Sequence, residues 1–148
     1  MKFYLNAFRF PTVKVNITNE DDNENASYDT LMKTWWNFYK NKKRFHFFFD
    51  FTKMNSFVSL KLIPNFIKQQ MEMKKLEKQY LDYSIVVINN SILINILNYI
   101  LQMITPIGIL YISNDLKVSN ELLRYLNSPF TSSVFLESYI VINNITKI

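Results

Sequence analysis

The chain has 148 residues, a net charge of +5, one glycine, one histidine and no cysteine. Without cysteine there are no disulfides or thiolate sites, and a single His46 excludes most histidine-built metal and acid–base sites. A single Gly108 excludes the glycine-rich loops that bind phosphate groups in nucleotide enzymes. The length corresponds to one domain that buries about two thirds of its unfolded surface. The excess of Phe, Ile, Asn, Lys and Tyr is typical of AT-rich coding, as in a protozoan parasite, a reduced bacterium or a large DNA virus.

The first forty residues predict two strands and a helix. Residues 2–17 are rich in aromatic and β-branched side chains and are interrupted by Pro11, so we expect two short strands or one bent strand. The acidic loop at residues 18–27 lacks the spacing and the turn glycine of an EF-hand, which favours a solvated loop. Ser27 precedes an apolar pattern of helical period, so we expect a helix over about 28–40 with Ser27 as its N-cap.

The middle of the chain predicts a buried strand and a long helix. Residues 41–51 form a basic turn that leads into a strand with large apolar residues on both faces, which is typical of a central strand covered by helices on both sides. His46 and Asp50 share a face of this strand, but four residues span about 13 Å, too far for a hydrogen-bonded dyad. We expect Asp50 to cap a turn and His46 to be either packed or exposed at an edge. Residues 56–81 predict a helix, which Pro64 either opens or kinks.

No charged side chain occurs between Tyr83 and Asn114, and this run is either a membrane span or the core of a soluble domain. Residues 85–88 predict a buried strand, after which polar residues recur every three or four positions along one helical stripe: Ser91, Asn95, Asn98 and Gln102. Pro106 and Gly108 then end the helix, and residues 109–113 predict another strand. Because a spanning helix needs about 20 uninterrupted apolar residues, strand–helix–strand is favoured over a membrane span.

The end of the chain predicts a helix and a strand. Residues 118–130 form a short amphipathic pattern that stops near Pro129, and Val134–Ile142 predicts an added strand. We therefore expect an α/β domain over residues 1–128 and a C-terminal extension, residues 129–148, that adds a strand to it. The expected order is β-β-α-β-α-β-α-β-α-β in a mostly parallel sheet flanked by helices. The added strand would lie at a sheet edge, where it could pair with a second copy to form a dimer.

Two segments carry a resemblance to known domains. In FHFFFDFTKMNSFVSLKLIPNFI (45–67) a hydrophobic strand ends in Asp50-Phe51-Thr52 and leads into a helix, which resembles STAS (anti-sigma-factor antagonist) and CRAL-TRIO domains. The segment YSIVVINNSILINILNYILQMITPIGILYISND (83–115) is similar to the CRAL-TRIO run of strand, helix and Pro-containing turn. The resemblance rests on pattern rather than on invariant motifs.

The resemblance implies two kinds of function. STAS regulators carry Asp-Ser-Ser/Thr-Gly at the helix start, with a serine that a partner kinase phosphorylates; of the matching residues 58–61 only Ser59 fits, so Ser59 is the candidate phosphorylation switch. CRAL-TRIO proteins carry lipids, which implies a ligand between sheet and helices. The N-terminal helical region and the gate of those carriers have no counterpart in this sequence.

The predicted function is a non-catalytic binding module in the cytoplasm, with protein–protein interaction as the preferred role. The alternative is a carrier or sensor of a small apolar ligand or lipid, which the aromatic excess favours. An enzyme is the third possibility, because the sequence shows no clustered carboxylates. No catalytic residue, metal or cofactor is predicted. A basic patch could face an anion: Lys40, Lys42, Lys43 and Arg44. Nucleic acid is disfavoured as a partner, because strand alternation places the neighbouring aromatics inside.

Overall fold

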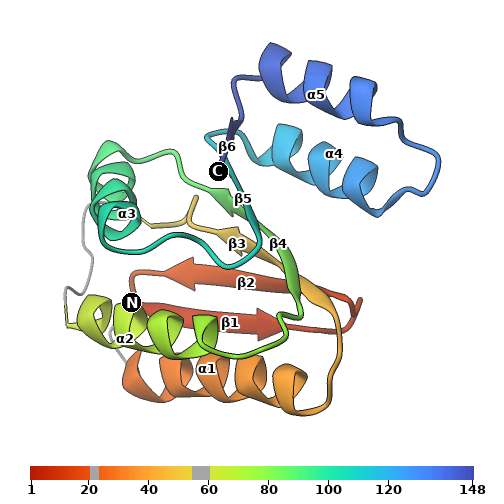
Figure 1. Ribbon diagram of the computed structural model, residues 1–148. Helices are drawn as coiled ribbons and strands as arrows, with labels where there is room; N and C mark the ends of the chain where they lie inside the picture. Colours follow the sequence, from red (N-terminus) through yellow and green to blue (C-terminus); the bar gives the residue numbers. More distant parts are fainter. Residues whose placement is uncertain (21–23, 55–60) are drawn as a thin grey trace.

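The computed structural model describes residues 1–20, 24–54 and 61–148. These residues form an α/β fold with a six-stranded sheet and five helices (Figure 1). The strands are β1 (Lys2–Asn6), β2 (Thr12–Thr18), β3 (Phe45–Asp50), β4 (Leu81–Val87), β5 (Ile109–Ser113) and β6 (Thr146–Lys147). The helices are α1 (Glu24–Lys40), α2 (Leu62–Lys74), α3 (Ser91–Met103), α4 (Leu116–Asn127) and α5 (Ser133–Ile142).

The sheet is mixed, which corrects the prediction of a mostly parallel sheet. Its strands lie in chain order, with β2 to β5 parallel to one another and β1 and β6 antiparallel at the two edges. The two antiparallel pairs arise from the connections at the two edges of the sheet. A short connection reverses the chain between β1 and β2, and the two successive helices α4 and α5 return the chain to β5 from the opposite end.

The two faces of the sheet are covered by different helices. Helices α1, α2 and α3 lie on one side, and α4 and α5 lie on the other (Figure 1). Because side chains alternate along a strand, Phe45 and Phe47 of β3 join the core with α1–α3, whereas Phe48 joins the core with α4 and α5. The prediction that this strand is central and buried on both faces is confirmed.

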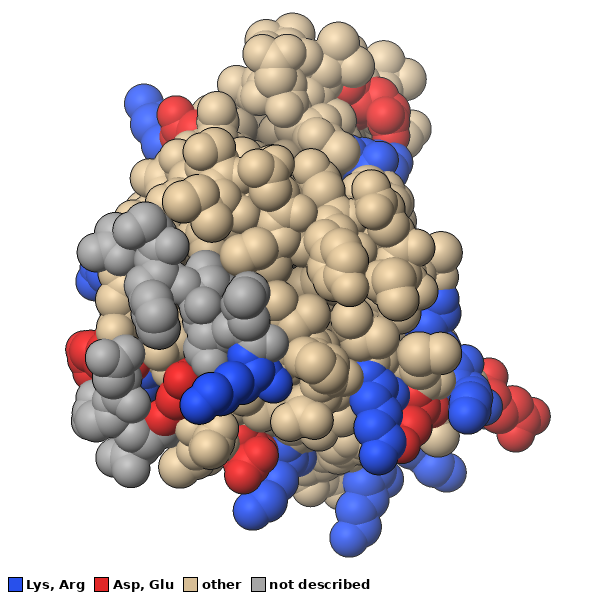
Figure 2. All heavy atoms as spheres, turned by 90° about the vertical axis from the view of Figure 1, so that its left-hand side faces the viewer, with Lys and Arg blue, Asp and Glu red and all other residues tan. Residues whose placement is uncertain are grey.

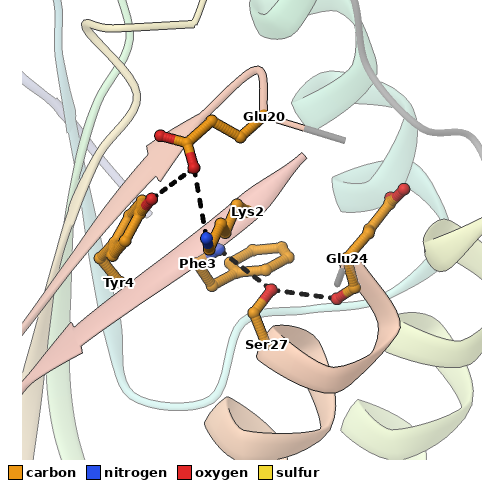
Figure 3. A network of polar contacts seen from close by, with 6 residues as sticks. All are labelled: Lys2, Phe3, Tyr4, Glu20, Glu24 and Ser27. Atoms are coloured by element: carbon orange, nitrogen blue, oxygen red, sulfur yellow. Dashed lines mark hydrogen bonds and ion pairs between the residues drawn. The ribbon is translucent and has the colours of Figure 1, made fainter. Parts of the chain in front are cut away.

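Helix α1 begins earlier than the sequence predicts, because Ser27 has a different role. The helix starts at Glu24, and the Ser27 hydroxyl donates to the Glu24 carbonyl oxygen at 3.0 Å. The same hydroxyl accepts the Phe3 backbone N–H at 3.2 Å, as Figure 3 shows. Beside it, Glu20 accepts the Tyr4 hydroxyl at 2.5 Å and pairs with Lys2 at 3.3 Å (Figure 3). Ser27 therefore joins α1 to the edge strand β1 instead of capping the helix.

Helices α2 and α3 resolve two questions that the sequence leaves open. Pro64 lies in the first turn of α2, where its missing N–H removes no helical hydrogen bond, so it opens the helix. Helix α3 is capped by the Asn90 side chain, which accepts the N–H groups of Ile92 and Leu93. The predicted polar stripe of α3 is exposed, as expected: Ser91, Asn95, Asn98 and Gln102. No helix in the described ranges is both long enough and apolar enough to cross a bilayer.

Val134–Ile142 is helical, and the prediction of a strand there is wrong. The Ser132 side chain caps α5 by accepting the Phe135 N–H at 3.1 Å, and Leu136 and Ile140, one helical turn apart, pack in the core with α4. The closing strand is only Thr146–Lys147. A dimer formed by strand pairing of residues 134–142 is therefore not available to this fold.

Gly108 provides a test of the turn between α3 and β5. Its φ is +70°, and a Cβ at this position would lie 2.7 Å from the Leu81 carbonyl oxygen and 2.8 Å from that of Asp82. We expect Gly108→Ala to lower the free energy of unfolding by at least about 2 kcal/mol, measured by urea denaturation, because a left-handed conformation and a backbone clash add together. The matched control is Lys42→Gly at φ 54°, which should be neutral or stabilising. An unchanged G108A midpoint would contradict this reading of the turn.

Candidate functional site

An apolar cavity of about 210 Å³ lies between the sheet and helices α1, α2 and α3. Helix α3 contributes one complete face to its wall: Leu93, Ile96, Leu97, Ile100 and Leu101. The opposite wall is the sheet, with Phe49 from β3, Val86 from β4 and Leu110 from β5. The cavity therefore draws on segments that are far apart in the sequence and meet only in the folded chain.

The cavity exists because the layer of helices does not close tightly on the sheet. Of the residues of α3 only Leu93 is buried, so the helix lies over the sheet without filling the space below it. Ser84 contributes to the wall from β4, where it is paired with Phe47 and Leu110, and its short side chain leaves room between these larger neighbours. Trp35 of α1 borders the same space.

The side chains that line the cavity in the described ranges are uncharged at neutral pH, and the amino group of the lining residue Met1 is paired with the Glu24 carboxylate at 3.8 Å. None of the cavity's lining side chains in the described ranges is Lys, Arg, His, Asp or Glu. The Tyr28 hydroxyl donates to Gln69 Oε1 at 2.7 Å, and burial raises the pKa of Tyr28 to about 12, so this group is neutral. Figure 2 shows that the outer surface on the side of α3 is also broadly free of Lys, Arg, Asp and Glu. The site is suited to apolar ligands and not to ions.

His46 belongs to a separate polar cluster on the opposite face of the sheet. Its Nε2 lies 2.6 Å from Thr12 Oγ1, and its ring stacks on Tyr83 with centroids 4.4 Å apart. Asn127, the last residue of α4, accepts the Tyr83 hydroxyl at 2.7 Å and donates to Thr12 Oγ1 at 3.4 Å. Thr12 and His46 are buried, at 7% and 4% exposed. The hydrogen bonds of Asn127 join the end of α4 to this buried hydroxyl–imidazole pair of the sheet. Of the two environments predicted for His46, packed or edge-exposed, the structure shows the packed one.

Asp50 lies where the sequence predicts it, at a turn. Its Oδ1 accepts the backbone N–H of Thr52 at 2.9 Å and the Thr52 hydroxyl at 2.6 Å. The described residues hold no group of three or more His, Cys, Asp or Glu side chains that could bind a metal ion. Asp50 therefore shapes the end of β3.

The predicted basic patch is divided among three environments. Lys40 and Lys42 line a groove of about 510 Å³ together with Glu77 and Lys78. Aromatic residues of α1 and of the segment that precedes β4 line the same groove. The Lys43 ammonium lies 5.7 Å from the centroid of the Phe10 ring, and Arg44 forms an ion pair with Asp82. Lys43 and Arg44 thus have contacts that differ from those of Lys40 and Lys42, and anion binding by this patch stays a prediction. Ser59 lies outside the described residues, so its proposed phosphorylation stays a prediction.

Comparison of the chain with family models, curated proteins and solved structures found no match. The cavity and the exposed surfaces are therefore the features of the molecule that bear on its function. Sequence reasoning missed Gln70, which lines the cavity and is 4% exposed. The signal for a residue such as Gln70 is a polar side chain at a position where the helical pattern calls for an apolar one. In this segment the many lysines make that signal hard to recognise.

The environment of His46 predicts how stability depends on pH. Burial lowers the pKa of His46 below its ordinary value of 6.5. Below pH 6.5 the unfolded chain gains a proton that the folded chain does not bind, so the free energy of unfolding should fall as the pH decreases from about 7.5 to about 5.5. His46→Gln should show a smaller decrease over the same range.

The measurement is urea unfolding at several pH values, together with NMR titration of the imidazole, whose signal is unambiguous because His46 is the only histidine. An imidazole that titrates above pH 6.5 in the folded protein would contradict the burial argument.

Proposed function

We propose that the chain is a non-catalytic binding module that holds a small apolar molecule between its sheet and helices α1–α3. The observation that carries this proposal is the 210 Å³ cavity with an uncharged wall. An engineered apolar cavity of about 150 Å³ in another protein stays dry and binds benzene, so a cavity of this size is large enough for a ring with a short substituent. Binding would replace an empty space with van der Waals contacts.

The resemblance to STAS and CRAL-TRIO domains is part of the proposal. It is supported by the opening strand pair and by the three parallel crossovers from β2 to β5. In a CRAL-TRIO-like protein a ligand between sheet and helices would be expected, and the cavity lies between those layers. A cytoplasmic location belongs to the same proposal.

The binding proposal is tested by filling the cavity. Native mass spectrometry and organic extraction of the purified protein first show whether a ligand co-purifies. Isopropylbenzene is then titrated by calorimetry into the wild type and into Ile100→Trp, whose larger side chain would project into the space that Ile100 lines. We expect the affinity of I100W to be about tenfold lower or weaker still, because the variant side chain occupies the ligand volume.

The matched control is Tyr99→Trp, which places the same side chain on the exposed side of α3 and should leave affinity unchanged. Far-UV circular dichroism establishes that both variants keep the fold. Equal affinity of I100W and wild type would place isopropylbenzene elsewhere and contradict the proposal.

A second candidate function is protein–protein interaction through helix α5. Val134, Val141 and Ile142 are 76%, 73% and 77% exposed, and Glu137 is the only charged residue of this helix. Val134 and Val141 are seven positions apart and therefore lie on one helical face. Exposed apolar side chains grouped on one face are typical of contact surfaces.

This second candidate predicts self-association, because an apolar face can pack on its counterpart in a second copy. Sedimentation velocity of the wild type should show a concentration-dependent increase in mass that Val141→Lys reduces. Asn98→Lys adds the same charge on the exposed stripe of α3 and should have no effect. A wild type that stays monomeric at all concentrations would exclude a second copy as the partner.

A further inference from the structure

Gln70 of α2 is the polar feature that distinguishes this cavity from a packing defect. The side chain lines the cavity and is 4% exposed, and its Nε2 has no hydrogen-bond partner within the described part of the chain. A buried amide N–H without a partner costs about 1–3 kcal/mol. Native proteins retain few such groups, and each one indicates a bound molecule, water or a functional role.

Two further polar groups near the cavity differ in whether they are hydrogen-bonded. The Tyr28 hydroxyl donates to Gln69, as described above. The Trp35 indole N–H also lacks a hydrogen bond, but it lies close enough to the Tyr39 hydroxyl to lower the pKa of that group, which burial otherwise raises. We therefore assign the main donor function of the cavity to Gln70, beside the hydroxyl of Ser84 in the same wall.

The charge of the surroundings limits what Gln70 can bind. A carboxylate in the cavity would have no Lys, Arg or His among the lining side chains of the described ranges. Met1 also lines the cavity, and its amino group is 3.8 Å from the Glu24 carboxylate. Transfer of an unpaired carboxylate into an apolar space is strongly unfavourable, so the ligand is neutral and an ionised fatty acid is excluded.

We propose that the cavity takes a neutral, mainly apolar molecule with a single hydrogen-bond acceptor, which accepts the Gln70 Nε2–H. Its size is roughly six to ten non-hydrogen atoms, by comparison with the benzene-binding cavity. Ketones, aldehydes and esters of aromatic or short aliphatic hydrocarbons are the class that fits. This inference rests on the proposed function and adds the chemistry of the ligand to it.

The test compares two probes of nearly equal size, acetophenone and isopropylbenzene. In acetophenone a carbonyl oxygen takes the place of one methyl group of isopropylbenzene. Affinities are measured by calorimetry for the wild type and for Gln70→Met, which keeps the side-chain length and removes the donor. The quantity of interest is the ratio of the two affinities, since it cancels the different hydration of the probes. We expect this ratio to fall roughly tenfold in Q70M, the effect of a carbonyl left buried without its donor.

Four controls make the outcomes distinct. Asn65→Met changes an exposed amide of the same helix and should leave the ratio unchanged, and Gln70→Leu repeats the test with a second side chain. Q70M without ligand should melt at the same or a higher temperature than the wild type, because the unpaired donor is gone. Benzoate at neutral pH should bind much more weakly than acetophenone.

The inference and the proposed function fail in different ways. If neither neutral probe binds the wild type, the proposed function is overturned. If both bind and Q70M leaves their ratio unchanged, Gln70 is not the ligand's donor and the inference alone fails. Binding of benzoate as tight as that of acetophenone would overturn the claim that the ligand is neutral.

Discussion

The burial of β3 on both faces is the constraint on which the rest of the structure depends. Phe45 and Phe47 are fully buried on the side of α1, where the Trp35 and Phe47 ring centroids are 4.9 Å apart. Phe48 is buried on the opposite side. Each such side chain contributes about 1.5–3 kcal/mol when it leaves water, and the strand requires helices on both faces to do so. The division into α1–α3 and α4–α5 follows from this requirement.

The two faces then differ in how completely they are filled. The face of α4 and α5 contains the Thr12, His46 and Asn127 cluster, whose polar atoms bond to one another. The face of α1–α3 keeps an apolar cavity with an unpaired Gln70 donor in its wall. One molecule with an apolar body and an acceptor would contact both the apolar wall and the Gln70 donor. This coincidence is the physical reason to regard the cavity as a binding site.

Local patterns predicted most elements of the fold, and tertiary contacts decided the remainder. The polar stripe of α3 recurs with the period of a helix, and the β-branched run of β4 is typical of a buried strand. Both predictions are confirmed. Residues 134–142 contain aromatic and β-branched residues that favour a strand, but the Ser132 cap and the hydrogen bond from Tyr139 to Glu121 stabilise a helix. The cavity could not be predicted, because its wall joins residues from Met1 to Leu110 and no local period records that proximity.

The contact between Ser27 and Phe3 also bears on how the sheet ends. An edge strand with free N–H groups can recruit a strand from another chain and begin aggregation. At one edge the Phe3 N–H is occupied by Ser27 of α1, and at the other β6 is two residues long and carries Lys147 in an ion pair with Glu137. A blocked donor, a short strand and a lysine are features that oppose edge-to-edge growth. The small side-chain contacts at the margins thus protect a chain unusually rich in Phe, Ile and Tyr from assembling through its own sheet.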